Sequence, residues 1–463
     1  MKQNTLKIAS LITALAFSAG SSAHADEAQL TALVQNMEAQ MSEMQRTIKW
    51  QGEQISKLGG PAAMSAQSAP QQVLSEKEFD EHLKRKIGEA DSWLKGLKFS
   101  GDMRLRYEAQ NEQHNSAVND RNRFRFRLRF GFEKKLSDEW KVGFRLASAV
   151  GSEGGTPANT STNTSFDTNF AYKDIAIDRA YATYLPKWAQ IGPVKQLEIT
   201  GGKFKNPFEE GSSMMIWDSD VTPEGVYEQL VTKVLKTDNV DVDHVLTAGQ
   251  MILEEGNASQ DRDDAELYAF QTGFRTKIST AALEKPVEHK VLLSYYDFTD
   301  YAKVGNFVNA NGNPACGSEL CSQHFRVLEI YNEIGAQFGS IPKLSLFYDW
   351  ARNIGESGRG GTTPASAEDS WGLGLKVGSA KKKGEWEASY GYYYIEPNAV
   401  PGGFNDSDFG HSDRRGSVAR LGYALTDNLV FNTSAFFTNR VTGGGLTADN
   451  ERDLFQADLV WKI

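Results

Sequence analysis

Apolar and polar residues alternate along most of this chain from residue 97 onward. The clearest segment is 123–133, where phenylalanine or leucine occupies every second position and arginine occupies most of the positions between. Alternation with period two predicts a β-strand that has one apolar and one polar face. The last segment, 455–463, follows the same pattern, and only Val460 breaks it.

About sixteen such segments are predicted, each near the length that a tilted strand needs to cross a membrane. They begin near Leu97, Arg121, Glu139, Lys173, Gln196, Glu224, Val240, Asp264, Val287, His324, Lys343, Glu368, Glu385, Arg414, Leu429 and Asn450. Short turns and long polar loops alternate between them; the long loops are expected at 111–120, 152–172, 206–223, 254–263, 300–323, 353–367, 397–413 and 441–449. Transmembrane barrels show this alternation because their turns are periplasmic and their loops external. A soluble sandwich gives no reason for it.

The final strand ends on Trp461, Lys462 and Ile463, and its apolar face would be an exposed edge in a soluble sheet. In a closed membrane barrel the strand pairs on both sides and lipid covers that face. The strand resembles the last strand of Gram-negative outer-membrane barrels, although Ile463 stands where a terminal Phe is usual. We therefore expect an all-β, antiparallel transmembrane barrel over 97–463. The alternative is the edge strand of a soluble sandwich.

The N-terminal part is predicted to be helical and processed. Residues 1–25 have the positive start, apolar centre and A-x-A end of a secretory signal, so the protein is expected in an oxidising compartment. A short membrane anchor is the alternative. Residues 26–58 carry apolar positions at heptad spacing and predict a coiled-coil helix paired with a sister chain, or else a helix packed within its own chain. A flexible linker, 59–73, and a short charged helix, 74–96, follow; the helix would lie under the barrel mouth or inside it.

Composition limits the classes of function. The hydrophobic fraction of 40% and the lack of a long apolar run after the signal argue against a helical membrane protein. The seven histidines are scattered, and no zinc motif, nucleophile elbow or phosphate loop occurs, so no enzyme and no cofactor are expected. The net charge of −10 and the export signal argue against a nucleic-acid partner for the arginine-rich strand.

The arginines are the most informative charged residues. Charged side chains are costly on the lipid face of a barrel and are tolerated in a wet lumen. If the phenylalanine faces meet lipid, seven arginines point inward: Arg104, Arg106, Arg123, Arg125, Arg127, Arg129 and Arg145. We interpret them as a cationic pore wall. The alternative is that they pair with lumen carboxylates and pack the interior.

A longer motif points to one family. Residues 202–208 read G-K-F-K-N-P-F, and residues 217–225 read W-D-S-D-V-T-P-E-G. This combination resembles the bacterial outer-membrane "putative porin" family, and with the signal, the seam helix and the last strand the resemblance covers nearly the whole chain. The resemblance implies a general-porin-like barrel. It implies passive diffusion of small hydrophilic solutes and ions.

The same motif frames the third long loop, which in general porins folds into the barrel and narrows it. By that analogy the expected constriction residues are Lys203, Lys205, Glu209, Glu210, Asp218 and Asp220, with the acidic ones facing the arginine wall. The alternative is an exterior loop. Cys316 and Cys321 lie in another long loop and predict a local disulfide; a metal site with His324 is the alternative.

Together these features predict an outer-membrane porin with both termini in the periplasm. Its expected partners are outer-membrane lipid, small hydrophilic solutes and two further copies in a homotrimer. The N-terminal helix is expected to contact peptidoglycan or another periplasmic partner. The alternative function is a barrel that acts as a scaffold or sheath for an electron carrier or the cell wall. Ion preference stays open, because the arginine wall and the acidic total favour opposite signs.

Overall fold

The computed structural model describes residues 96–114, 117–148, 159–255, 264–301, 311–314, 325–355, 367–442 and 451–463. All of them belong to the compact unit that spans 86–463. The predicted signal, coiled coil and linker lie outside the described residues, as do the charged helix up to residue 95 and both cysteines. No helix within the described ranges is long and apolar enough to cross a membrane.

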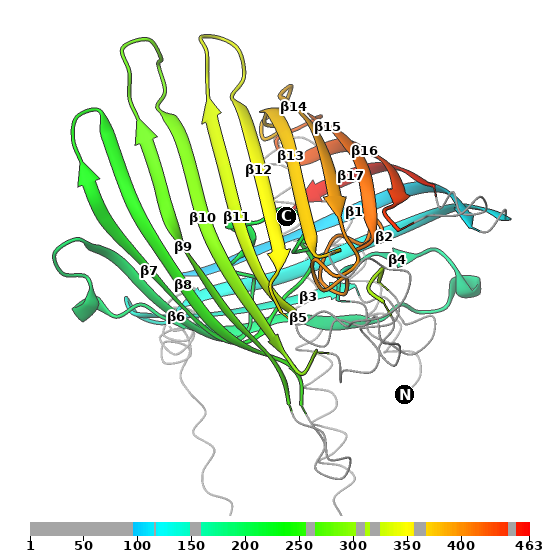
Figure 1. The fold of residues 1–463 in the computed structure, drawn as a ribbon, viewed down its shortest axis with the longest axis horizontal. Helices are drawn as coiled ribbons and strands as arrows, with labels where there is room; N and C mark the ends of the chain where they lie inside the picture. Colours follow the sequence, from blue (N-terminus) through cyan, green and yellow to red (C-terminus); the bar gives the residue numbers. More distant parts are fainter. Residues whose placement is uncertain are drawn as a thin grey trace, which may run out of the picture. The chain divides into compact units, whose positions relative to one another are not determined.

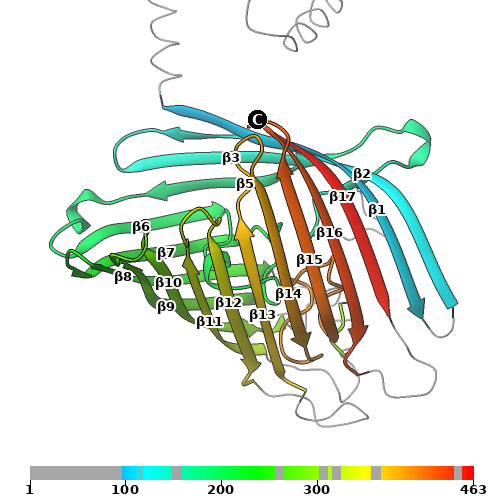
Figure 2. The same ribbon diagram turned by 90° about the horizontal axis from the view of Figure 1, so that it is seen from above.

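A closed antiparallel barrel forms this unit (Figures 1 and 2). The described residues form 17 strands. Among them the two-residue β4 (Thr164–Ser165) pairs with β2, and the other 16 make the wall. These are β1 (Leu97–His114), β2 (Ala117–Lys135), β3 (Trp140–Ser148), β5 (Ile175–Tyr184), β6 (Val194–Lys203), β7 (Glu224–Lys236), β8 (Val240–Glu254), β9 (Ala265–Ile278), β10 (Val287–Thr299), β11 (Phe325–Ala336), β12 (Leu344–Asn353), β13 (Asp369–Gly378), β14 (Trp386–Ile395), β15 (Arg414–Ala424), β16 (Leu429–Arg440) and β17 (Arg452–Lys462). The first strand pairs with both β2 and β17, which closes the barrel.

The predicted barrel class and strand number are confirmed, and nearly every strand begins within two residues of its predicted start. The largest difference is the first loop, expected over 111–120. There β1 continues to His114 and β2 resumes at Ala117, and the two strands stay paired to their ends. Polar residues extend these strands because the ladder satisfies their backbone groups whatever the side chains are.

The alternation on β2 separates lipid-facing from lumen-facing residues as the sequence predicts. Leu128 and Phe130 are 39% and 46% exposed on the outside, whereas Arg125 and Arg127 are 7% and 9% exposed on the inside. Phe126 is only half-buried, because its ring packs against that of Phe166 at 5.9 Å. The barrel therefore presents an aromatic and aliphatic outer face, which in a membrane barrel is covered by lipid.

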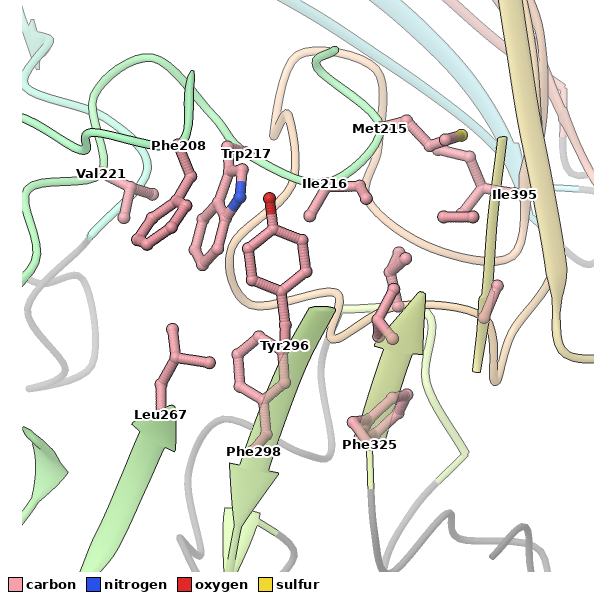
Figure 3. Packing of buried hydrophobic residues seen from close by; sticks show 14 of the residues in the cluster. Phe208, Met215, Ile216, Trp217, Val221, Leu267, Tyr296, Phe298, Phe325 and Ile395 are labelled. Carbon is pink, nitrogen blue, oxygen red and sulfur yellow. The ribbon is translucent and has the colours of Figure 1, made fainter. Parts of the chain in front are cut away.

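The largest apolar cluster lies inside the barrel. It joins the inner faces of β8 to β12 and β14 to β17 with side chains of the connection between β6 and β7, residues 204–223. Figure 3 shows Phe208 and Trp217 of this connection close to Tyr296 and Phe298 of β10. The loop is thus held in the lumen by burial of apolar surface, which is the dominant stabilising term in folding.

Candidate pore constriction

The loop 204–223 packs against one side of the inner wall through its aromatic residues. Phe208 is fully buried and Trp217 is 3% exposed. Both rings meet the ring of Tyr296 edge-on, with centroids 5.8 and 5.4 Å away. Edge-to-face pairs of this kind add to the energy of burial, so this contact fixes the loop against β10.

Polar contacts hold the same loop to three neighbouring strands. The Ser213 amide donates to Asp349 of β12 at 2.8 Å. Glu210 accepts from Arg275 of β9 at 2.7 Å, and its carbonyl oxygen accepts from Lys290 of β10 at 2.6 Å. The loop is therefore anchored by charge-assisted bonds as well as by apolar packing.

A second loop, 396–413, also folds inward and joins the first. The Asp218 amide donates to the Phe404 carbonyl at 2.7 Å, and the Asp406 amide donates to the Met214 carbonyl at 3.1 Å. The Ser407 amide donates to the Asp218 carboxylate at 3.3 Å. These two backbone bonds and the bond to the Asp218 carboxylate join the two loops within the lumen.

Three carboxylates near this junction titrate away from their ordinary range. Burial, and then the neighbouring carboxylates Asp406 and Asp220, raises the pKa of Asp218 well above 3.8. Burial and then Asp408 raise the pKa of Asp406 to about 6. Burial acts in the same direction on Asp408, but Arg106 and other arginines outweigh it and lower that pKa to about 2. The junction therefore holds, side by side, an acid that ionises only near pH 6 and one that is already ionised above about pH 2.

Carboxylates compensate the arginine wall of β1 and β2. Arg106 binds Asp458 of β17 through two bonds of 2.7 and 2.9 Å. Arg127 and Arg129 share Asp102 of β1, each at 2.7 Å. Glu108, which is 1% exposed, forms ion pairs with both Arg123 and Arg125. These arginines pair with lumen carboxylates, which is the alternative that the sequence leaves open.

Loop side chains reach this wall from three segments. Asp220 of the first loop lies 3.7 and 3.3 Å from Arg127 and Arg129. Asp408 of the second loop lies 3.2 Å from Arg106. Arg104 donates to the Asn163 amide oxygen at 3.1 Å from Nε. Both inward loops are therefore fastened to the arginine wall as well as to the apolar wall.

The other predicted constriction residues have different partners. Lys203 pairs with Glu224 at 2.8 Å, and Lys205 pairs with Glu209 at 3.2 Å. Four acidic loop residues were expected to face the arginine wall, and within the described part of the chain Asp220 is the one that forms ion pairs with it. Glu209 and Glu210 lack such contacts because η3 (Glu209–Gly211) lies near β9 and β10.

Several residues of the site were missed from sequence. Asp102, Glu108 and Asp458 occupy polar positions of the first and last strands, and barrel closure brings those strands together. Because a closed barrel must pair its first and last strands, the sequence could have predicted that these carboxylates lie near the arginines. Asp408 lies 302 residues from Arg106, and no local pattern connects them. Within the described residues, no group of three or more His, Cys, Asp or Glu could hold a metal ion.

The chain is similar to one family of known proteins and to several solved structures. The profile of the family described as "Putative porin" matches residues 110–327 and 309–462. OprB from Pseudomonas putida, in a high-pH structure, has 13% identity and a TM-score of 0.48 over 81% of this chain and 96% of that chain. OmpF from Salmonella typhi, in a complex with daunomycin, has 10% identity and a TM-score of 0.45 over 79% of this chain and 97% of that one. No curated protein matches the chain. Because the profile covers well over half of its length, the chain belongs to the "Putative porin" family of outer-membrane β-barrels.

Proposed function

We propose that the protein is a diffusion porin, which passes small hydrophilic solutes and ions across the outer membrane. The observation that carries this proposal is the loop 204–223, which contacts opposite sides of a closed barrel from within. Such a loop narrows the aqueous path through the barrel, and solutes pass it by diffusion without any reaction. In a narrow path, lumen charges act on the whole cross-section, because the screening length is about 10 Å at 0.1 M salt.

In this proposal the predicted constriction residues divide into two groups. The paired arginines of β1 and β2 support the wall and position the loops, whereas Arg145 of β3 pairs with Asp178 of β5 within the wall. Glu210 is 62% exposed at its side chain and Lys205 is 57% exposed, so they present charge to the solute path. Family and fold point to a channel rather than to an enzyme.

Conductance and uptake measurements test the porin role. Purified protein should give discrete conductance steps in planar bilayers and should let liposomes swell in a small sugar. A sheath or scaffold role is the competing proposal. It is favoured by the dense packing of the second inward loop, where Val400 and Asn405 have no exposed surface. Absence of both steps and swelling, with folded protein present, would support the sheath.

We also propose that residues 1–25 direct export and that both ends of the barrel lie in the periplasm. An even number of wall strands brings the two ends to the same side of the membrane. A tag placed after Ile463 should therefore resist protease in intact cells and be cleaved after the outer membrane is opened. Cleavage in intact cells would reverse the proposed orientation.

The oligomer is proposed to be a homotrimer joined through the helix 26–58. Deleting 26–58 should weaken the oligomer in native electrophoresis and leave the barrel's β-sheet spectrum unchanged. An oligomer of unaltered stability would remove the helix from this role, although barrel walls would still associate. Contact of the helix with peptidoglycan is tested by the same deletion in a pull-down with cell-wall material.

A disulfide between Cys316 and Cys321 is proposed for the long loop that follows β10. Alkylation of the unreduced protein should add no mass, and alkylation after reduction should add two labels. Two labels without reduction would exclude the disulfide.

A further inference from the structure

Arg145 of β3 and Arg179 of β5 lie directly opposite each other in the barrel ladder. A β-bulge at this point adds Asp178 to β5, so that two residues of β5 face one of β3. Ile177, which precedes the bulge, is 58% exposed on the outside, whereas Asp178 is 6% exposed. The bulge thus brings Asp178 and Arg179 onto the inner face beside Arg145.

The charges of this group do not balance. Asp178 forms its ion pair with Arg145. For Arg179, the described part of the chain supplies no hydrogen bond or ion pair, and its Nε atom is buried without an acceptor. The Nη2 atom of Arg145 is also buried and unpaired. The next arginine on the wall, Arg129, already shares Asp102 and Asp220.

Such an arrangement is unfavourable without a further anion. Like charges directly opposite each other destabilise a β-ladder. Buried donors without acceptors are rare in folded proteins, and each calls for an explanation such as an ion that belongs at the site. By contrast, six arginines of β1 and β2 each have a carboxylate or an amide oxygen within reach: Arg104, Arg106, Arg123, Arg125, Arg127 and Arg129. Arg125 also has a buried Nε atom without an acceptor, but its Nη atoms reach Glu108 and the Asn163 carbonyl. Arg179 differs from them in having no such oxygen partner among the described residues.

We propose that Arg145 and Arg179 form an oxyanion-binding site on the inner wall, for the phosphate or carboxylate group of a small solute. The planar guanidinium presents paired donors that match both groups. This site adds binding of a solute to the proposed diffusion pore. It rests on the proposed function only because the solute must reach the wall through the lumen. A wall site of this kind concentrates anions in the lumen.

Calorimetric titration of the purified full-length protein with inorganic phosphate at low ionic strength tests the site directly. Wild-type protein should bind phosphate saturably, and Arg179→Gln should weaken binding by about tenfold or more, as expected for loss of a charge-assisted hydrogen bond. Arg179→Lys keeps the positive charge but loses the paired guanidinium donors, so its phosphate affinity should lie between those of the wild type and Arg179→Gln. The matched control is Arg415→Gln, since Arg415 is exposed on β15 and its loss changes the net charge equally. Repeating the titration with succinate shows whether phosphate or carboxylate is preferred.

The proposal is overturned if wild-type protein binds neither anion, or if Arg179→Gln and Arg415→Gln weaken binding equally. Circular dichroism of both variants confirms that the barrel is folded. Because the titration needs no conduction, its failure is distinct from failure of the pore. If the pore conducts but binds no oxyanion, the porin role stands and this site does not. If phosphate binds with no conductance, the site stands and the porin role fails.

Discussion

The two sides of the lumen hold the same loop in opposite ways. On β1, β2 and β17 the wall is a ladder of arginines and carboxylates, and Asp220 joins it. On β9, β10 and β11 the wall at the same loop is mainly apolar, and Trp217 and Phe208 pack against Tyr296. Only Glu210, at the exposed edge of this contact, bonds to Arg275 and Lys290 there among the described contacts between the loop and β9 and β10 that involve charged side chains. One loop therefore bridges a charged surface and an apolar surface.

The two sides differ in how strongly they hold the loop and in how far that hold depends on salt and pH. Burial of aromatic rings is worth several kcal/mol and depends little on salt. Buried ion pairs lose much of their attraction to desolvation, and exposed ones are screened. We infer that the apolar side holds the loop in place and that the charged side sets its register and its response to pH and salt.

The apolar anchor should give the largest effect. Trp217→Ala removes a buried indole that contacts Tyr296, Phe298 and Phe404, and about 3–5 kcal/mol of packing energy is lost with it. Limited proteolysis should then cut within 204–223 much faster. The control is Trp188→Ala, because Trp188 is 70% exposed in the turn after β5. Equal cleavage of both variants would show that the aromatic contact does not hold the loop.

The outer face gives the next effect. Phe130→Arg places a charge among lipid-facing residues and should cost about 2–4 kcal/mol in unfolding experiments in lipid vesicles. Phe338→Arg, in the turn between β11 and β12, should cost about 0–1 kcal/mol. Phe338 is exposed to a similar degree, 51% against 46%, so the pair differs in depth rather than burial. Similar costs for both would place the membrane elsewhere on the barrel.

The charged anchor should give a smaller effect. Asp220→Asn removes ion pairs to Arg127 and Arg129 but leaves Asp102 with both, so about 1–3 kcal/mol is lost. The reversal potential under a salt gradient should shift toward anions, and the shift should shrink at about 1 M salt, where the screening length is about 3 Å. Glu224→Gln serves as the control. An unmoved reversal potential at low salt would place Asp220 outside the solute path.

The junction of the two loops should respond to pH. The pKa of Asp406 is raised to about 6 in the folded protein, so the stability it contributes is full below its ordinary 3.8 and falls as pH rises through about 6. Asp218 acts in the same direction, whereas Asp408, with its pKa lowered to about 2, stays ionised across this window. The Asp218 amide, which donates to Phe404, should therefore exchange faster at pH 7.5 than at pH 5 after correction for intrinsic rates. Asp406→Asn should reduce that difference. A corrected rate that is independent of pH would contradict the assignment.

The strands were predictable because their signal is local. The alternation of Phe124 to Phe132 with arginines fixes both the strand and its inward face. The polar ends of β1 and β2 gave no such signal, since residues 111–114 and 117–120 lack an apolar face, and a loop was predicted there.

The partners within the lumen were less predictable, because contacts across a barrel join residues far apart in sequence. Arg106 was expected to face inward, but its bond to Asp458 needs the closed ladder between β1 and β17. Its contact with Asp408 needs the conformation of a loop with no repeating pattern. The bulge at Asp178 breaks alternation at a single residue, and this deviation is too short to recognise from one sequence.

The most direct test of the account is single-channel conductance of the purified wild-type protein beside Trp217→Ala in planar bilayers. The account predicts discrete steps for the wild type, and larger steps for the variant because its loop no longer narrows the path. Trp188→Ala should give wild-type steps. Folded wild-type protein that shows no steps, or a Trp217→Ala variant whose steps equal those of the wild type, would contradict a pore narrowed by the loop 204–223.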